Sequence, residues 1–317
     1  MTAKEKPDAE IEKQLAGIKD PSLAKSARRL LELAAKNEKP VYEGPEPQQL
    51  LLFPQWASTR RAAPCAVFRS ALFPALKRQK RPFLKEQQIA AVDGVKVAFT
   101  GEQFDQSDLD VYLELLHIMK EQPSNTDCTF SAHGLLKSLG RSTGNKDHKW
   151  LHSVLIRLCG GVVDMTDHKK RYFGQLLQGG VKDEITKHYT LSLNPQFAAL
   201  FRAAWASLEH EQRRRLGRNA TAKALHAYYS THAAPSAHRF ETLAEIAGLK
   251  NSNRRDLKAN LIKAHDLLAS QEVQFLSGYE VASDTIKAHI NHTGGQLAHI
   301  AQKALKSGKG SRAKITG

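Results

Sequence analysis

The apolar residues of this chain repeat one order of elements twice, and this repeat restricts the fold more than any other feature. In the first half, the strand-like segments "CAVFRSALFPAL" and "VKVAFTG" precede a helix predicted over about 106–122. A short strand, a short helix capped by Ser131, a turn and a second long helix follow. The two long helices carry apolar residues at spacings of three and four, namely Leu109, Tyr112, Leu113, Leu116 and Met119, then Leu151, Val154, Leu155 and Leu158. The alternating segments "VVDMTDHKKRYFGQLLQG" and "HYTLSLN" then predict β-hairpin strands.

The second half has the same order. "ATAKALHAYYSTH" predicts a helix, "RFETLAEIAGL" a short helix that ends at Gly248, and "NRRDLKANLIKAHDLLAS" a long helix. "VQFLSGYEVAS" and "TIKAHIN" predict a closing hairpin. Helix, short helix, turn, helix and hairpin is the order of a winged helix-turn-helix. The predicted fold class is therefore α+β, with two tandem winged-helix domains and flexible N- and C-terminal segments.

Composition shifts predict the boundaries. Residues 1–47 read as a flexible N-terminal segment with one helix over 22–35, and 48–64 as a linker rich in proline. The first winged-helix domain is predicted at 65–202 and the second at 203–293. Residues 294–317 contain five lysine and arginine residues and no acidic residue, and are predicted to be a disordered basic tail.

Charge indicates the kind of partner. The chain has 47 basic and 32 acidic residues, a formal net charge of +15, and such a field attracts polyanions. Nucleic acid is the leading partner, and ribosomal, membrane-surface or heparin-like partners are the alternatives. No leader or membrane-spanning apolar run is found, so we expect a cytoplasmic protein associated with the nucleoid or a plasmid. Three cysteines without CxxC spacing favour buried thiols over disulfides or a structural zinc site, and no cofactor or metal is predicted.

The second unit carries the clearer DNA-binding pattern. In a helix-turn-helix the second helix enters the major groove with its N-terminal residues. Here that helix begins at the predicted cap Asn253, and its turn and first turns carry Lys250, Asn251, Arg254, Arg255 and Lys258, away from the apolar stripe Leu257, Leu261, Ala264 and Leu268. Arginine can pair with guanine and asparagine with adenine, so these side chains are predicted to contact bases or adjacent phosphates. The alternative is a solvated helix face in which Arg254 or Arg255 pairs with Asp256.

The first unit carries a weaker version of this pattern. Its third helix opens with Asn145, Lys146, His148 and Lys149, but Asp147 lies among them, so we predict phosphate contacts more than base contacts. A solvated face is the alternative. The turn 167–171, with Lys169 and Lys170, is predicted to be the tip of the wing and is basic enough to reach the DNA backbone or a minor groove, but an ordinary exposed hairpin is the favoured interpretation. At the inter-domain connection, before the first helix of the second unit, lie four arginines that would contact phosphate or solvate the linker, namely Arg213, Arg214, Arg215 and Arg218.

Catalytic signatures are weak. "GRSTGNKDHK" does not match the spacing of a phosphate-binding loop. A nicking enzyme would need paired metal-binding histidines and an accessible tyrosine, whereas "HINH" separates its histidines by two residues and Tyr228-Tyr229 fits a helix core. No carboxylate cluster suggests a two-metal nuclease. The chain is therefore predicted not to be an enzyme.

The segment "PQQLLLFPQW" at 47–56 has two interpretations. It is either the first strand of a core or an exposed peptide left for a partner. The winged-helix plan does not require it, which favours the exposed peptide.

The segments "QLLLF", "RSALF", "VKVAFTGEQFDQSDLDVYLELL", "CTFSAHGLLKSLG" and "DHKWLHSVLIRL" together resemble the TrfA family of plasmid replication initiators, over about residues 48–290. The resemblance implies a protein that binds tandem repeats (iterons) in a plasmid origin, opens adjacent AT-rich DNA and recruits the host's replicative helicase and initiator. It implies main iteron contacts by the second unit, and dimerisation through the first. Some relatives also bind single-stranded origin DNA.

The resemblance also implies a peptide of the form Gln-Leu-x-Leu-Phe that docks into the host's sliding clamp. Gln49, Leu50, Leu52 and Phe53 match this form. An ordered peptide of this kind would place its leucines and phenylalanine in an apolar pocket. The alternatives to an initiator are a winged-helix transcriptional repressor that binds an operator and, from the enzyme class, a nicking replication protein.

Overall fold

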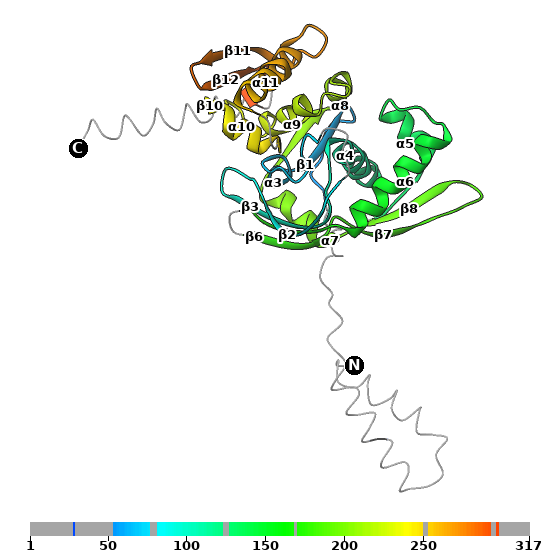
Figure 1. Ribbon diagram of the computed structural model, residues 1–317. Helices are drawn as coiled ribbons and strands as arrows, with labels where there is room; N and C mark the ends of the chain where they lie inside the picture. The colour runs from blue at the N-terminus through cyan, green and yellow to red at the C-terminus, as the bar shows by residue number, and fades with distance from the viewer. Residues whose placement is uncertain are drawn as a thin grey trace, which may run out of the picture. The chain divides into compact units, whose positions relative to one another are not determined.

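The computed structural model describes residues 28, 53–76, 81–122, 127–167, 170–249, 253–292 and 296–297. Helices and strands are mixed throughout these residues (Figure 1). The prediction of a mixed α and β fold is therefore confirmed. The predicted flexible N-terminal segment and basic tail lie outside the described residues, apart from Arg28, Gln296 and Leu297.

The described residues form two large hydrophobic cores and a small cluster of Ala75, Ala224 and Ala247. We call residues 53–209 the first unit and residues 210–292 the second unit; of the second unit's residues, Ala227 packs in the first core. The elements of the first unit are β1 (Arg60–Pro64), α3 (Cys65–Phe68), β2 (Phe83–Ile89), β3 (Val95–Glu102), α4 (Gln106–Glu121), β4 (Asp127–Ser131), α5 (Ala132–Ser138), α6 (Asn145–Gly160), β5 (Val162–Asp167), β6 (Lys170–Gln175), β7 (Leu177–Lys182), β8 (His188–Leu193), α7 (Pro195–Ala198), η1 (Ala199–Arg202) and β9 (Trp205–Glu209). Those of the second unit are α8 (His210–Arg215), α9 (Ala220–Tyr229), β10 (His238–Arg239), α10 (Phe240–Ile246), α11 (Arg254–Ala269), β11 (Leu276–Ala282) and β12 (Thr285–Ile290).

The repeat seen in the sequence is present in the structure. Apart from β5 and β6, which come between α6 and β7, the order α4, β4, α5, α6, β7, β8 matches the order α9, β10, α10, α11, β11, β12. Each set closes with a three-stranded antiparallel sheet, in the order β4-β8-β7 in one unit and β10-β12-β11 in the other. The same topology in both units means that each presents an equivalent long helix, α6 or α11, beside an equivalent hairpin.

The apolar stripes predicted for the long helices are buried. On α4, Leu109 and Met119 are at most 1% exposed, and on α6 Leu151 and Leu158 are fully buried. The Ser131 cap is confirmed, since its hydroxyl accepts a hydrogen bond from the backbone N–H of Gly134 at 3.0 Å. That serine caps the short helix α5; of the two long helices, α4 has a side-chain cap at Asp105, whereas α6 begins after Gly144 without one and is defined by its buried face.

Two predictions from the first half are wrong. Cys65–Phe68, predicted as strand, is the short helix α3, whose four residues are all buried. The predicted wing strands β5 and β6, which flank the turn 167–171, do not form the hairpin beside α6, because they join the separate four-stranded sheet β2-β3-β5-β6. The buried Val163 and Met165 of β5 pair there with Phe99 and Val97 of β3. Alternation shows that one face of a strand is buried, but it does not identify the partner strand.

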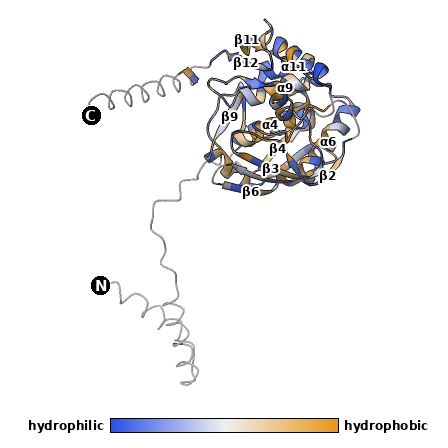
Figure 2. Cartoon of the chain, turned by 60° about the vertical axis from the view of Figure 1, so that its left-hand side comes forward, coloured by the Kyte–Doolittle hydropathy of each residue, from blue (hydrophilic) through white to orange (hydrophobic). Residues whose placement is uncertain are grey.

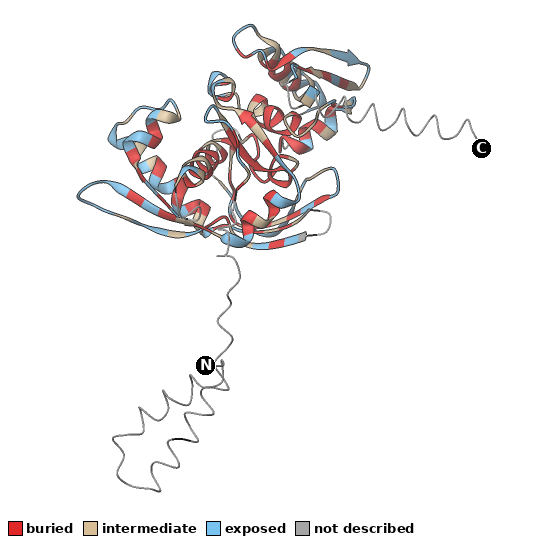
Figure 3. Ribbon diagram, turned by 180° about the vertical axis from the view of Figure 1, so that it is seen from behind, coloured by how far each residue is buried: buried red, intermediate tan, exposed pale blue. Residues whose placement is uncertain are grey.

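The hairpin beside α6 is instead formed by β7 and β8, with its turn at 183–187. It projects beyond α6 in Figure 1, and its outer end is exposed in Figure 3. The predicted domain boundary between residues 202 and 203 lies just before β9. This strand pairs with β1 in an antiparallel manner and adds Ala206 and Leu208 to the first core.

The prediction of an exposed peptide is wrong for Phe53. Its side chain is 2% exposed and packs edge-on against Phe201, with ring centroids 5.2 Å apart. Trp56 stacks on the same ring at 6.0 Å and donates a hydrogen bond from Nε1 to Nδ1 of His117 at 3.2 Å. Aromatic side chains gain more by covering one another and η1 than by facing water. The other predicted clamp-binding residues, Gln49, Leu50 and Leu52, lie outside the described residues.

Candidate nucleic-acid interface

The start of α11 is built as the sequence predicts. The Oδ1 atom of Asn253 accepts a hydrogen bond from the backbone N–H of Asp256 at 2.9 Å, so the Asn253 cap is confirmed. Its Nδ2 donates to a carboxylate oxygen of Asp256 at 2.9 Å, which occupies that acid. Lys250 and Asn251, predicted to lie on the preceding turn, are outside the described residues.

Arg254 forms ion pairs with two acidic residues of the second unit. Its guanidinium forms an ion pair with Asp284, in the turn between β11 and β12, and a second with Glu241 of α10 at 3.4 Å. The side chain is nevertheless 70% exposed. The pairing with Asp256 considered from the sequence is replaced by these two contacts. Arg254 therefore links the helix, the hairpin turn and α10 while its outer surface remains accessible.

Arg255 and Lys258 have different surroundings. Arg255 is exposed, and within the described part of the chain its guanidinium forms no ion pair. The ammonium group of Lys258 lies 5.0 Å from the centre of the Phe240 ring, a cation–π contact that leaves it half-buried. Figure 2 shows hydrophilic segments on α11. Of the three described cations at this helix start, Arg255 is thus the one whose donors are available to a ligand.

At the start of α6, Asp147 interacts with the preceding turn and does not pair with the lysines of the helix. Asp147 accepts a hydrogen bond from the Ser142 hydroxyl and forms an ion pair with Arg141 at 2.9 Å. The hydrogen bond, with the nearby arginine, lowers the pKa of Asp147. Arg141 also lies 3.6 Å from the centre of the Trp150 ring.

With Asp147 and Arg141 paired to each other, the remaining polar side chains at this helix start face solvent. Asn145, Lys146 and Lys149 are exposed, and His148 is half-buried. Among the described residues no ion pair involves either lysine. These positions can meet phosphate without first breaking a salt bridge.

The β7–β8 hairpin carries residues that the sequence analysis missed. The carboxylate of Asp183 accepts hydrogen bonds from the backbone N–H groups of Ile185 and Thr186, at 2.7 and 2.9 Å, and so fixes the turn. Ile185 is 92% exposed at its tip. Lys182 and Lys187 both pair with Glu184, at 2.7 and 3.0 Å. Alternation of apolar and polar residues identifies strands, so it gave no signal for the residues of this turn.

Of the two predicted wing residues, only Lys170 is described, and it is not at this tip. Lys169 is outside the described residues, and Lys170 begins β6 in the four-stranded sheet. The arginines at the start of the second unit also form more ion pairs within the protein than predicted. Arg213 is buried against Asp110, while Arg214 and Arg215 pair with Glu211. Both roles predicted for Arg213, phosphate contact and solvation of a linker, are therefore wrong, because its side chain is buried in an ion pair.

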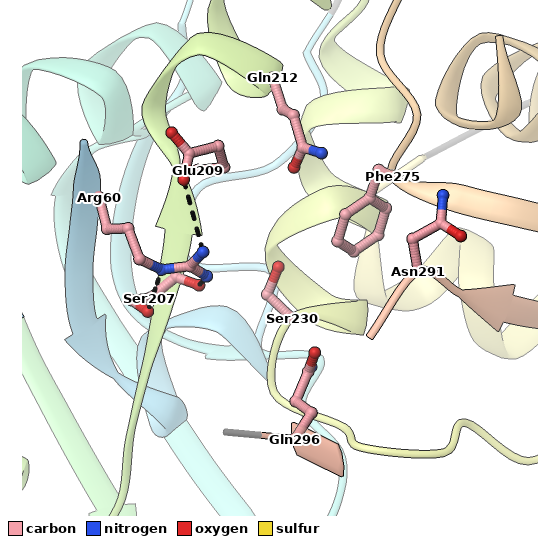
Figure 4. A pocket seen from close by; sticks show the side chains of 8 residues that line it. All are labelled: Arg60, Ser207, Glu209, Gln212, Ser230, Phe275, Asn291 and Gln296. Atoms are coloured by element: carbon pink, nitrogen blue, oxygen red, sulfur yellow. Dashed lines mark hydrogen bonds and ion pairs between the residues drawn. The ribbon is translucent and has the colours of Figure 1, made fainter. Parts of the chain in front are cut away.

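A cavity of about 240 Å³ lies where the first and second units meet (Figure 4). Its lining residues are Arg60, Ser207, Glu209, Gln212, Ser230, Phe275, Asn291 and Gln296. Arg60 donates to the Ser207 hydroxyl at 2.7 Å and pairs with Glu209 at 3.5 Å. The one cation of this lining is therefore already satisfied.

Metal and membrane features were sought in the same residues. Where the structure describes the chain, no group of three or more His, Cys, Asp or Glu side chains is placed to hold a metal ion. None of its described helices combines the length and apolar character needed to cross a bilayer.

An available arginine at one helix start and unpaired lysines at the equivalent helix, in a chain of net charge +15, define a candidate DNA-binding protein. The family model described as TrfA protein matches residues 46–274. The chain therefore belongs to the TrfA family of plasmid replication initiators, as the sequence resemblance indicated. No curated protein matches it in a direct comparison.

Solved structures give more distant likenesses. Domains 2 and 3 of RctB, as selenomethionine derivatives, align with a TM-score of 0.49 and 11% identity over 72% of this chain and 99% of that chain. The Pi initiator protein in complex with iteron DNA aligns with a TM-score of 0.47 and 8% identity over 74% of this chain and 98% of that chain.

Proposed function

We propose that the protein initiates replication of a plasmid by binding tandem iterons in its origin and helping to open the adjacent AT-rich DNA. Membership of the TrfA family supports this function. The observation that carries the DNA-binding step is the exposed start of α11, where Arg255 has no ion-pair partner among the described residues and the Asn253 cap occupies the neighbouring acid.

We further propose that the two units are winged-helix domains. In this arrangement α11 enters the major groove and the β11–β12 hairpin contacts the flanking backbone. The equivalent surfaces of the first unit are α6 and the β7–β8 hairpin. Arg255, with Arg254 and Lys258, contacts base edges or adjacent phosphates, while Lys146 and Lys149 of α6 contact phosphates.

Footprinting on the DNA that flanks this gene tests the function. We expect several evenly spaced protected repeats, followed by permanganate reactivity of thymines in the adjacent AT-rich segment. Protection of a single palindrome without melting would support the transcriptional repressor instead. A covalent protein–DNA nick on supercoiled plasmid with Mg²⁺ would support the nicking enzyme.

Docking of Gln49, Leu50, Leu52 and Phe53 into the host's sliding clamp is also proposed. Because Phe53 packs on Phe201, docking through this ring requires release of the segment around residues 53–56 from the first core. Surface plasmon resonance with immobilised clamp tests this, since Leu52→Ala should abolish clamp binding and retain DNA binding. Equal clamp binding by wild type and Leu52→Ala would contradict the proposal.

Other partners are proposed from the family alone. These are the host's replicative helicase and initiator, single-stranded origin DNA, and a second copy bound through the first unit. Pull-down with purified helicase and initiator, binding to labelled single strands, and analytical ultracentrifugation of the full chain test these in turn. A protein that sediments as a monomer at all concentrations would contradict dimerisation.

A further inference from the structure

We propose that Asp110 is a positioning residue that fixes the DNA-contacting helix of the second unit relative to that of the first. Asp110 lies in the second turn of α4 and is not part of the proposed DNA-binding surface. The proposed DNA binding is needed for only one of the two tests below, the measurement with DNA.

Asp110 joins the units through both of its carboxylate oxygens. Oδ1 accepts a hydrogen bond from Nε of Arg213 on α8 at 2.6 Å, and Oδ2 accepts one from Nζ of Lys223 on α9 at 2.6 Å. Arg213 is 4% exposed and also donates to the side chain of Gln106 at 2.9 Å and to the backbone carbonyl of Lys223 at 3.0 Å. One residue of α4 therefore holds two consecutive helices of the second unit.

The charges explain why this contact is specific. Burial alone would raise the pKa of Asp110, but the positive charges of Arg213 and Lys223 outweigh it and lower the pKa. Asp110 is thus ionised at neutral pH between two cations. Charge-assisted hydrogen bonds of this kind depend strongly on geometry. A slide of α9 along α4 would lose them and leave buried charges without partners, which is strongly unfavourable.

The same helix also holds α6. Asp108, two residues before Asp110, is fully buried, and its two oxygens accept hydrogen bonds from Arg157 of α6 at 3.0 and 3.1 Å. Arg81 provides a further ion pair to Asp108 at 2.8 Å. Neighbouring carboxylates of α4 therefore connect it to the DNA-contacting helix of the first unit and to α9, on which α11 packs in the second.

A second region of contact limits rotation about Asp110. The backbone N–H of Ala75 donates to the carbonyl of Ala247 at 2.7 Å, just after α10. Gly248 follows with φ of +66°, and a Cβ atom there would lie 2.2 Å from Pro74. The second unit therefore contacts the first at two separate places, through α8 and α9 and just after α10. A single contact would allow the second unit to rotate, whereas two contacts fix its orientation relative to the first.

A fixed orientation predicts how DNA is bound. When both helices engage one duplex, their targets must lie at one separation and one rotational phase. Inserting about five base pairs, roughly half a turn, between the two targets places them on opposite faces of the duplex. Simultaneous binding is then lost unless the units can move apart.

The test uses the full-length protein and Asp110→Asn, which removes the charge at nearly constant volume. Lys223→Met is a milder second variant, because Arg213 keeps its bond to Asp110. Glu114→Gln is the matched control, since Glu114 is another buried carboxylate of α4 but pairs with Arg61 inside the first unit, at 2.5 and 3.2 Å.

The first measurement needs no DNA. In scanning calorimetry we expect one cooperative transition for wild type and for Glu114→Gln, with the control at lower temperature. We expect Asp110→Asn and Lys223→Met to separate the transitions of the two units. A single transition in both interface variants would overturn the proposal, and Lys223→Met decides it if Asp110→Asn does not fold.

The second measurement uses the flanking DNA segment that wild type protects, with and without the five-base-pair insertion. We expect the insertion to weaken binding by about a hundredfold for wild type and Glu114→Gln, through loss of simultaneous engagement. The penalty should shrink to about threefold or less in the interface variants, because a mobile second unit can follow its displaced target. An unchanged hundredfold penalty in those variants would also overturn the proposal. If wild type protects no flanking DNA, the proposed function fails while the calorimetric comparison still decides the role of Asp110.

Discussion

Arg254, in the first turn of α11, forms an ion pair with Asp284, in the turn between β11 and β12. The pair joins the helix proposed to enter the major groove to the hairpin proposed to lie beside it. It also places one negative charge within a surface that we propose to face phosphates. We therefore expect Asp284 to weaken DNA binding by the second unit.

Replacing Asp284 by Asn should strengthen DNA binding. The change releases Arg254 and removes repulsion of phosphate, so we expect affinity for the protected flanking segment to rise about two- to fivefold. Fluorescence anisotropy measures this, with Ser283→Ala as the control in the same turn. Weaker binding by Asp284→Asn would mean that the ion pair holds Arg254 in its DNA-contacting position.

Arg255→Ala should weaken binding to the cognate repeat by about 1–3 kcal/mol and relax specificity at one base pair, as expected for loss of a paired contact to guanine. Titrations against the repeat and its single-base variants measure both effects. Lys263→Ala, an exposed cation two turns further along α11, is the control. An equal small loss on every sequence would assign Arg255 to phosphate.

Lys149→Ala should weaken binding to all sequences alike. Loss of one phosphate contact should reduce the slope of log affinity against log salt concentration by about one. Lys96→Ala, on the exposed side of β3, removes the same charge away from the proposed interface. If both variants reduce the slope equally, α6 makes no local phosphate contact.

Phe53→Ala should destabilise the first unit by about 3 kcal/mol, because a buried ring packed on Phe201 is lost. Denaturant unfolding measures the change. Phe83→Ala is the control: its ring is 74% exposed, so we expect a change within about 0.5 kcal/mol. A neutral Phe53→Ala would indicate that this segment leaves the core in solution and would restore the exposed-peptide interpretation.

Stability should fall on mild acidification partly through His117. Burial, together with the charge of Arg61, lowers the pKa of His117 to about 4. A histidine with a lowered folded-state pKa is protonated first in the unfolded chain, so its contribution is complete above about pH 6.5 and is lost as pH falls toward 4. Unfolding free energies from pH 7 to 4 should decline less steeply for His117→Gln. The exposed His133→Gln should follow wild type, and parallel curves for all three proteins would contradict this assignment.

Helix stripes, caps and their repeated order could be predicted because they depend on neighbours three or four residues away. The Asn253 cap and the buried face of α4 are examples. The strand partners could not be predicted. Val163 and Met165 show that β5 has a buried face, but only the packing of β3 decides that β5 joins the four-stranded sheet and not the hairpin beside α6.

The candidate site divides in the same way. Composition and local periodicity in the amino-acid sequence determined the order of the repeated helices and the basic helix starts at Asn145–Lys149 and Asn253–Lys258. The family was indicated by the resemblance of whole segments to known proteins. Only the tertiary structure decided which cations are available. Arg213 is buried against Asp110, which lies 103 residues away in the sequence, while Arg255 remains open to solvent. Side chains far apart in the sequence become ion-pair partners only when the core brings their helices together, and no local pattern records that pairing.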